Sequence, residues 1–183
     1  MIVSTLVVNQ QIRYIAEKDL GYNTEQVLAF RLAASDTAEI MKTALLSLPG
    51  VTSITATNLL PATGDSGATF TIKDENGEEH KDIVSMASID YDYLPTMELD
   101  LLKGRNFSKN LVTDKKAIII NETLAKKYGW TDPIGQVIAM KNEIRDEEYQ
   151  VIGLVEDFNM LGLYEEVKPF AFFLKPQFDW GAQ

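Results

Sequence analysis

Runs of apolar residues bounded by turn-forming residues divide the first third of the chain into predicted elements. The runs Gln26–Leu32 and Val51–Asn58 predict strands. Between them, apolar residues recur at helical spacing over residues 40–48, after a capping box at Asp36–Glu39 and before Pro49-Gly50. This spacing predicts a helix with one buried face. Because a crossover helix joins parallel strands, we expect a β-α-β unit here.

The pattern changes at Pro61–Gly67, a segment rich in turn formers that we interpret as the boundary of an inserted subdomain. Thr69–Lys73 alternates between apolar and polar residues and predicts a strand. Asn76-Gly77 then favours a type I′ turn, and Lys81–Ile89 is the expected return strand. The segment therefore predicts a β-hairpin.

The stretch from Ala117 to Ile138 combines a strand, a helix, a turn and a second strand. The first strand, Ala117–Ile120, is followed by Asn121, whose side chain can accept from the backbone N–H of Thr123 or Leu124. Gly129 can end the helix in the left-handed conformation. The residues expected on the buried side are Leu124, Ala125 and Tyr128. The turn is expected at Asp132–Gly135, and the second strand at Val137–Met140.

Four further segments complete the predicted elements. Tyr91–Met97 predicts a short helix, and Leu111–Lys116 is expected to be a loop. Tyr149–Glu156 predicts a strand that runs back towards the first subdomain. The apolar run Phe170–Leu174 is then expected to rejoin the first sheet.

Several motifs, in this order and spacing, resemble the MacB-like periplasmic core domain of FtsX-like ABC transporter permeases. The Asn-Glu, Leu-Ala and Asp-Pro-Ile-Gly signature lies within Ala117–Ile138. Upstream, Tyr91–Met97 and Leu102–Phe107 resemble conserved segments of that family, and downstream Val151–Phe158 and Lys168-Pro169 do the same. Each motif is weak alone, so the resemblance depends on their order over residues 21–176.

The resemblance implies an α/β (α+β) fold with two subdomains. Residues 1–20 would be an N-terminal helix, the stub of a transmembrane helix. Residues 21–60 and 167–183 would form a membrane-proximal α/β subdomain, truncated at its C-terminus, and residues 61–166 an inserted membrane-distal subdomain. A truncated domain would leave a sheet edge bare near Phe170–Leu174, and we expect two chains to pair there.

The N-terminus alone leaves two readings open. Residues 2–8 are mostly apolar, but this run is too short to span a membrane, which takes about 20 residues. It is either the outer end of a transmembrane helix, continuing as a polar helix through Lys18 and stopping near Gly21, or an ordinary amphipathic helix. The family resemblance favours the first reading.

Composition narrows the function classes. With 183 residues and 45% hydrophobic residues, the chain can bury a core. Its net charge of −10 argues against nucleic acid or an anionic membrane face as a partner. The absence of cysteine excludes disulfides, thiolate catalysis and zinc-thiolate sites. No phosphate-binding loop motif is present, so any ATPase must be another polypeptide or a separate domain.

Gly64–Gly67 has the sequence Gly-Asp-Ser-Gly, as in the nucleophile loop of chymotrypsin-like proteases. Such catalysis needs a histidine that accepts the proton of Ser66. The single histidine, His80, follows the serine and lies beside the predicted Asn76-Gly77 turn. A flexible turn explains the tetrad better, and no catalytic residue is expected.

Two acidic runs could attract a hard cation. They comprise Asp74, Glu75, Glu78 and Glu79, and Glu143, Asp146, Glu147 and Glu148. Neither has the spacing of a calcium loop, and solvated hairpin tips explain both. We therefore expect no metal site and no cofactor. A set of aromatic residues could line a groove for an apolar ligand, but such residues are more often core and rim. They are Tyr91, Tyr93, Trp130, Tyr149, Phe158, Tyr164 and Trp180.

The resemblance implies a non-enzymatic domain at the periplasmic face of the bacterial inner membrane. Its partners would be the transmembrane helices of the same permease, a cytoplasmic ATPase subunit, a second permease copy and a periplasmic protein. Motion driven by ATP would pass outward through the helix Val3–Lys18, acting as a lever, and through the loops Pro61–Gly67 and Phe158–Glu166. A ligand-binding sensor domain is the alternative function, and a hydrolase using Ser66 is a second.

Overall fold

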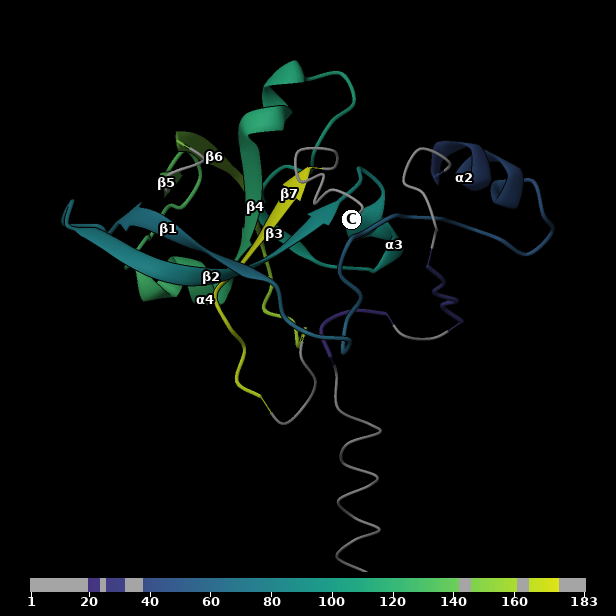
Figure 1. The fold of residues 1–183 in the computed structure, drawn as a ribbon, viewed down its shortest axis with the longest axis horizontal. Helices are drawn as coiled ribbons and strands as arrows, with labels where there is room; N and C mark the ends of the chain where they lie inside the picture. The colour runs from purple at the N-terminus through teal and green to yellow at the C-terminus, as the bar shows by residue number, and fades with distance from the viewer. Residues whose placement is uncertain (1–19, 24–25, 32–37, 142–145, 161–164, 175–183) are drawn as a thin grey trace, which may run out of the picture.

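The computed structural model describes residues 20–23, 26–31, 38–141, 146–160 and 165–174. Within these residues, seven strands form one strongly curved sheet with short helices around it (Figure 1). The strands are β1 (Gly67–Lys73), β2 (Glu79–Ile89), β3 (Leu101–Gly104), β4 (Ala117–Asn121), β5 (Val137–Lys141), β6 (Asp146–Val155) and β7 (Phe170–Leu174). The helices are α2 (Ala38–Leu46), α3 (Tyr93–Thr96), α4 (Glu122–Lys127) and the 3₁₀ helix η2 (Val112–Lys116).

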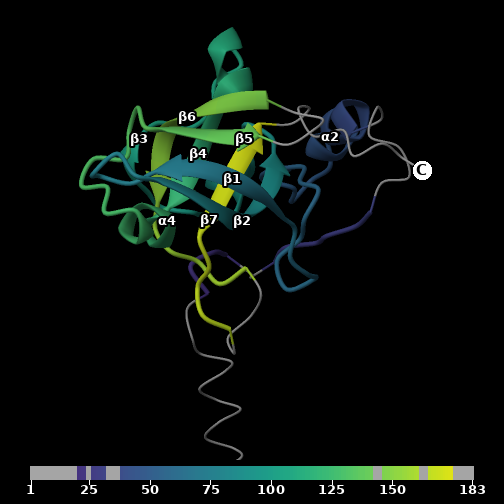
Figure 2. The same cartoon turned by 60° about the vertical axis from the view of Figure 1, so that its left-hand side comes forward.

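The sheet closes on itself because β5 pairs with two strands. The order is β3-β6-β4-β7-β2-β1-β5, and β5 pairs in addition with β6. Figure 2 shows β5 between β1 and β6. One edge of β6 carries β5 along residues 146–150 and β3 along residues 153–155. Six strands therefore form a ring, and β3 lies outside it as an appended strand.

Alternate residues of the six ring strands point into the ring, where they form one hydrophobic core. In β7, for example, Ala171 and Phe173 belong to this interior cluster, and the stacked rings of Phe70 and Phe173 cross it. The end of the ring is covered by α4 and the residues after it, through Leu124, Tyr128 and Trp130. Because both faces of β4 and β7 are buried, the sequences of these two strands are continuous apolar runs, whereas β1 alternates between buried and exposed residues.

The opposite face of β2, β4 and β7 carries a second core. The intervening residues of β7, Phe170, Phe172 and Leu174, pack there against α3 and the segment after β6. Phe172 contacts the rings of Tyr93 and Phe158. The sheet body, by which we mean residues 67–174 as described, is thus held by two cores that share its central strands.

The junction of β4 and α4 forms as the sequence predicts. The Asn121 side chain accepts a hydrogen bond from the Leu124 N–H at 3.1 Å, and it also accepts from the Phe170 N–H at 2.9 Å. Gly129 has φ 71°, which is the predicted left-handed conformation. The predicted buried residues Leu124, Ala125 and Tyr128 are all buried. Asn121 therefore both begins α4 and fastens it to β7.

The predicted hairpin is confirmed, but its turn type is wrong. Strands β1 and β2 pair antiparallel from Gly67 opposite Ser85 to Lys73 opposite Glu79. A type I′ turn needs positive φ at both Asn76 and Gly77, and only Gly77 has it, at 84°. The loop is longer than two residues because the Asp74 carboxylate accepts from the N–H groups of Asn76 and Glu78. The aspartate side chain thus selects a wider turn.

The segment expected as a loop at Leu111–Lys116 contains the 3₁₀ helix η2, so that expectation is wrong. Figure 1 shows this short helix projecting from the top of the molecule. The Asp114 carboxylate is fully buried at its base. It accepts two hydrogen bonds from the Arg105 guanidinium, at 2.7 and 2.8 Å, and one from the Ser108 N–H. These bonds fold the segment into a turn of helix.

Other predicted elements are present with small shifts. The short helix within Tyr91–Met97 forms as α3, and the strands expected at Val137–Met140 and Tyr149–Glu156 form as β5 and β6. The turn before β5 is closed by a hydrogen bond from the Gln136 N–H to the Pro133 oxygen. Gly135 has φ 91° in this turn. The turn therefore lies one residue later than expected.

The strand Phe170–Leu174 forms, but its expected place is wrong. β7 lies in the middle of the sheet, parallel to β2 and antiparallel to β4. All five of its residues are buried. The predicted bare edge and the pairing of two chains there are therefore wrong, because both edges of β7 already have a partner within the chain.

The predicted β-α-β unit does not form in the described residues. Helix α2 is present, but residues 26–31 contain no strand, and from 51–58 only Thr57 forms an isolated antiparallel bridge to Ile89. The helix face expected to be buried is largely open, with Ile40 72% exposed. Helical spacing predicts α2 correctly, but the flanking segments find no strand beside them in this part of the chain.

The mixed α+β fold class is confirmed. The division into a membrane-proximal and an inserted membrane-distal subdomain stays a prediction. The N-terminal helix predicted at residues 1–20 lies outside the described residues except for Leu20, as do the start of the capping box at Asp36-Thr37 and the chain end at 175–183.

Candidate functional site

Three segments that are distant in sequence meet below the sheet body, and we call this region the junction. It comprises residues 20–23, the loop 61–67, and the described parts of the segment after β6, residues 157–160 and 165–168. Figure 1 shows the purple, blue and yellow-green traces gathered there. This is the place where the chain following residue 19 enters the folded body.

Residues 20–23 are fastened to the body by backbone hydrogen bonds on both sides. The Leu20 oxygen accepts from the Asn159 N–H at 2.8 Å, and the Asn23 N–H donates to the Met97 oxygen at 2.8 Å. The Asn23 side chain also donates to the Glu98 carboxylate. Tyr22 packs against the second core, and this burial raises the pKa of its hydroxyl. The segment is therefore part of the body and not a loose linker.

Gly21 makes this attachment close. Its φ of 77° is in the left-handed region that favours glycine. A Cβ at this position would lie 2.8 Å from the Asp157 carbonyl oxygen and 2.9 Å from the Phe158 Cα. Backbone atoms cannot move aside as a flexible side chain can. The backbone of residue 21 thus lies directly on the segment that follows β6.

Asp157 links the junction to α4. Its carboxylate accepts from the backbone N–H and from the hydroxyl of Thr123, both at 2.8 Å. Thr123 lies in the first turn of α4, where backbone N–H groups lack partners within the helix. Asp157 therefore connects the segment touching Gly21 to the helix that covers the interior core.

The two loops predicted to join the subdomains contact each other. The Ala62 N–H donates to the Met160 oxygen at 2.8 Å, and Lys168 lies 3.2 Å from both the Asp65 and the Glu165 carboxylates. These contacts raise the pKa of the Lys168 amine, chiefly through its hydrogen bond to Asp65. The structure therefore brings the predicted loops together beside residue 20, although their role in motion stays a prediction.

Helix α2 and the segment after it are connected to the body through Asp90. Its carboxylate accepts from the Lys42 amine at 2.8 Å and from the Ala56 N–H at 3.1 Å, and the Thr55 hydroxyl also donates to it. Lys42 contacts the Asp92 carboxylate as well. Burial opposes the charge on Lys42, but its hydrogen bonds to the two carboxylates outweigh that cost and raise its pKa. A polar cluster thus replaces an apolar interface here.

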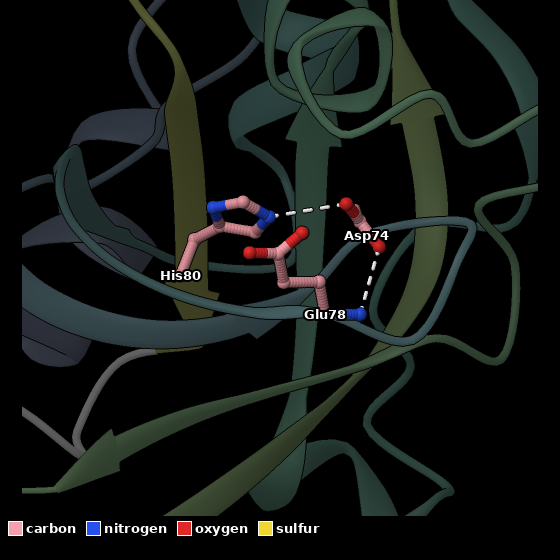
Figure 3. A group of neighbouring side chains, drawn as sticks. All are labelled: Asp74, Glu78 and His80. Atoms are coloured by element: carbon pink, nitrogen blue, oxygen red, sulfur yellow. Dashed lines mark hydrogen bonds and ion pairs between the residues drawn. The ribbon is translucent and has the colours of Figure 1, made fainter.

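A second group of polar residues lies at the tip of the β1–β2 hairpin. The ligand atoms of Asp74, Glu78 and His80 all lie within 4.8 Å of one another. Figure 3 shows the Glu78 carboxylate beside both other side chains, and the His80 Nε2 is 3.1 Å from the Asp74 Oδ2. The hydrogen bond with His80 is the largest of the contacts that lower the pKa of Asp74.

The same side of the hairpin faces α4 across an open groove of about 360 Å³. The Tyr128 hydroxyl donates to the Asp82 carboxylate at 2.7 Å, and Lys127 lies 3.0 Å from that carboxylate. The hydrogen bond from Tyr128, followed by that from Lys127, lowers the pKa of Asp82. Burial, together with this bond, raises the pKa of Tyr128. The groove is thus lined by paired charges.

The structure does not bring the residues of the hydrolase alternative together. His80 lies opposite Ile72 near the tip of the hairpin, whereas Ser66 directly precedes β1 at its other end. At about 3.3 Å per residue, the two are roughly 20 Å apart along the strand. Asp65 is paired with Lys168. The Gly64–Gly67 segment is a loop leading into β1.

The aromatic residues within the described part of the chain belong mainly to the core, as the sequence favours, and do not line a groove for an apolar ligand. Of the aromatic set, Tyr93, Trp130, Tyr149 and Phe158 are buried in the two cores, and Tyr91 is half-buried. Tyr164 and Trp180 lie outside the described residues. A small hollow at the junction, beside Phe158 and Lys168, has a volume of about 10 Å³, which is room for about one water molecule. This hollow is too small for the pocket that a sensor domain would need.

The two acidic runs differ in the structure: two carboxylates of the first run lie close together, whereas the described residues of the second run follow one another along a strand. Asp74 and Glu78 lie together, but their sequence positions did not indicate that His80 lies with them. His80 adds a nitrogen ligand to the two carboxylates. Asp146, Glu147 and Glu148 are exposed along β6, and Glu143 lies outside the described residues. The hairpin register, with alternate residues on one side, was the signal that could have placed His80 beside Asp74.

Sequence reasoning also missed the residues that fasten the junction and α2. Gly21 was expected only as the end of a helix, and Asp90 and Asp157 were not singled out as connections. A glycine at the end of a predicted helix is a weak signal, since its close approach to residue 157 depends on tertiary packing. Among the helices of the described residues, none has the length and apolar character that crossing a membrane requires.

Comparisons with known proteins agree with this fold. None of the curated proteins matches the chain. Among solved structures, the periplasmic region of MacB from Actinobacillus actinomycetemcomitans is 13% identical with a TM-score of 0.53, over 76% of this chain and 56% of that one. The extracellular domain of the noncanonic ABC-type transporter YknZ from Gram-positive bacteria is 20% identical with a TM-score of 0.51, over 78% and 64%. The chain thus spans less than two thirds of these relatives' length.

At these identities the structural likeness shows the fold alone. A family model gives the stronger finding, because it matches residues 3–175, which is nearly the whole chain. It describes the MacB-like periplasmic core domain. The motifs around Asn121, Gly135 and Asp157 that carried the sequence resemblance hold α4, the turn before β5 and the junction in the structure. The chain belongs to the family of MacB-like periplasmic core domains, found in ABC transporter permeases.

Proposed function

We propose that this domain transmits conformational change from the transmembrane helices of its permease to a substrate or to a partner protein outside the membrane. The observation that carries the proposal is the junction, where residues 20–23 are hydrogen-bonded on both sides and Gly21 lies against backbone atoms of the body. A motion of the preceding segment would act on the body directly.

The attachment of residues 20–23 can transmit motion to the body only if these residues are held firmly against it. Residues 20–23 have that property, because two backbone hydrogen bonds of 2.8 Å and the packing of Tyr22 hold a four-residue segment. From there, Asp157 continues the connection to α4 through Thr123. The path therefore runs from the N-terminal side through the junction to the helix that covers the interior core.

The partners follow from membership of a permease family and are part of the proposal. They are the transmembrane helices of the same permease, a cytoplasmic ATPase subunit, a second permease copy and a protein at the periplasmic side. The domain would lie at the periplasmic face of the bacterial inner membrane, with the helix Val3–Lys18 as the lever. ATP bound and hydrolysed in the cytoplasm would supply the free energy.

The lever can be tested in the full permease with its ATPase. A flexible Gly-Ser insertion after Lys18 separates the lever from the junction, so we expect transport to be abolished while ATP binding stays intact. The matched control is the same insertion between Lys109 and Asn110, an exposed turn outside the junction, which should leave transport unchanged. Normal transport with the insertion after Lys18 would contradict mechanical transmission.

We propose that the domain itself performs no catalysis. The separation of Ser66 from His80 along β1 supports this, because a serine nucleophile needs an adjacent base. In the full permease, the Ser66→Ala substitution should leave transport and ATPase activity unchanged. Loss of a hydrolytic activity of the purified domain in that variant would overturn the proposal.

A further inference from the structure

The hairpin tip carries a set of donor atoms that the proposed function does not use. One imidazole nitrogen and two carboxylates, from His80, Asp74 and Glu78, lie within 4.8 Å of one another (Figure 3). The side chains come from both sides of one turn, because Asp74 follows β1 and His80 lies in β2. Because both sides of the turn supply ligands, the conformation of the turn can itself position these side chains.

The Asp74 carboxylate divides its two oxygens between the turn and the cluster. The Oδ1 atom accepts from the N–H groups of Asn76 and Glu78, both at 2.9 Å, and this holds the carboxylate in place. The Oδ2 atom faces the His80 Nε2 at 3.1 Å. One oxygen therefore fixes the geometry while the other remains directed at the imidazole.

The Glu78 carboxylate completes the set. Within the described part of the chain it has no hydrogen-bond or ion-pair partner, although the N–H of the same residue donates to Asp74. His80 is also only half-buried, so a solvated ion can reach the cluster from the groove between the hairpin and α4. The three donors are thus close together, accessible and on one face of the turn.

The donor types select the ligand. Hard cations such as Ca²⁺ and Mg²⁺ are bound through oxygen alone, whereas a neutral imidazole nitrogen with carboxylate oxygens is a donor set that suits Zn²⁺. Three protein ligands leave a fourth tetrahedral position for water. We propose that Asp74, Glu78 and His80 form a binding site for one Zn²⁺ ion at the tip of the β1–β2 hairpin.

Side chains of both charges line the groove beside the hairpin tip, so some attract a cation and others repel it. Glu75 and Asp82 line the same groove and attract a cation, whereas Lys126 and Lys127 line it and repel one. Both lysines have acidic partners, Glu122 and Asp157 for Lys126 and Asp82 for Lys127. Zn²⁺ would replace the hydrogen bond between His80 and Asp74 with two metal bonds and would bring Glu78 into the same set.

The test is a titration of the full chain with Zn²⁺ by isothermal calorimetry at neutral pH. We expect one site per chain, weakened by about tenfold or more in His80→Ala and in Glu78→Gln, since each removes one of three ligands. Circular dichroism establishes that the variants are folded. The matched control is Glu75→Gln, which removes a neighbouring carboxylate outside the set and should keep the affinity within about twofold.

Co²⁺ gives a second readout, because its visible absorption intensifies in a four-coordinate site. We expect this absorption in the unmodified chain and its loss in His80→Ala. Absence of Zn²⁺ binding at millimolar concentration, equal affinity in His80→Ala, or an effect of Glu75→Gln as large as that of Glu78→Gln would overturn the site. Tighter binding of Ca²⁺ than of Zn²⁺ would do the same. None of these results depends on whether the domain transmits motion.

Discussion

The sheet body and the segment 26–60 are both rich in apolar residues, yet they use them differently. In the body, strands such as β4 and β7 bury every residue between two cores. In the segment, Leu28 is 85% exposed and Phe30 is 52% exposed, and α2 is connected through the polar cluster around Asp90. Apolar sequence therefore creates a core only where backbone pairing places it between layers.

The difference explains how the two regions should respond to substitution. Burial stabilises the body by about 25 cal/mol for each Å² of apolar surface removed from water. The segment gains little from that effect and depends on a few hydrogen bonds and ion pairs, each contributing about 1 kcal/mol. Stability should therefore be concentrated in the body, with the segment opening at a lower free energy.

The largest effect is expected from Phe172→Ala in β7. The side chain is fully buried in the second core against Tyr93 and Phe158, so the cavity should cost about 3 to 5 kcal/mol of unfolding free energy. Urea denaturation followed by circular dichroism measures the change. The control, Leu28→Ala, removes an apolar side chain from the exposed segment and should change stability by less than about 0.5 kcal/mol. Similar losses in the two variants would remove the contrast between the regions.

Asp114→Asn should cost about 2 to 3 kcal/mol at neutral pH, because it removes a buried carboxylate that Arg105 and the Ser108 N–H stabilise. Burial alone would raise the pKa of Asp114, but these bonds more than compensate and lower it. The stabilisation is therefore fully present above the unfolded pKa, about 3.9, and is lost as the pH falls through the folded value.

Chemical denaturation from neutral to acidic pH tests this dependence. The difference in stability between the unmodified chain and Asp114→Asn should shrink as the pH falls below about 4. Asp100→Asn changes an exposed carboxylate of the same body and serves as the control, with an effect near zero. A difference that stayed constant across this pH range would show that the charge of Asp114 contributes nothing.

Gly21→Ala should cost about 2 kcal/mol, more than Gly50→Ala, which should cost about 1 kcal/mol. Both glycines have positive φ, at 77° and 89°, so both substitutions strain the backbone. Only at Gly21 does the added Cβ also meet backbone atoms of Asp157 and Phe158, whereas nothing lies within 4 Å of a Cβ at Gly50. Thermal unfolding compares the stability of the two variants. Equal losses of stability would mean that the junction accommodates the added Cβ at residue 21 without a clash.

The smallest global effect is expected from Lys42→Met, about 1 kcal/mol or less. This change removes the ion pairs of Lys42 with Asp90 and Asp92 but keeps the length of the side chain. Amide hydrogen exchange should become faster in α2 while the amides of β4 keep their protection, because the two cores are unaffected. Faster exchange in β4 as well would show that the segment stabilises the body after all.

Sequence signals predicted those elements whose first and last residues are capping or turn-forming residues. Asn121 and Gly129 determine conformation within a few residues, so α4 was predicted correctly. Asn76-Gly77 likewise indicated the β1–β2 hairpin, although the Asp74 side chain decides the turn type. The strands at 26–32 and 51–58 were wrong over the described residues, because an extended, alternating segment becomes a strand only beside a partner. The candidate sites show the same limit: Asp74 and Glu78 are local to one turn, whereas the contact of Gly21 with Asp157 joins distant segments.

The sequence alone determined the family of the chain, the apolar runs that become β4 and β7, and the helix that begins at Asn121. It also determined the acidic balance, which argues against nucleic acid as a partner. Only the tertiary structure decided that β7 lies in the middle of the sheet and that β5 closes the ring. It also decided that the loop 61–67 and the described residues after β6, 157–160 and 165–168, meet beside residue 20. The physical reason is that capping and turn formation act between neighbours in sequence, whereas strand partners are chosen by which surfaces can be buried together.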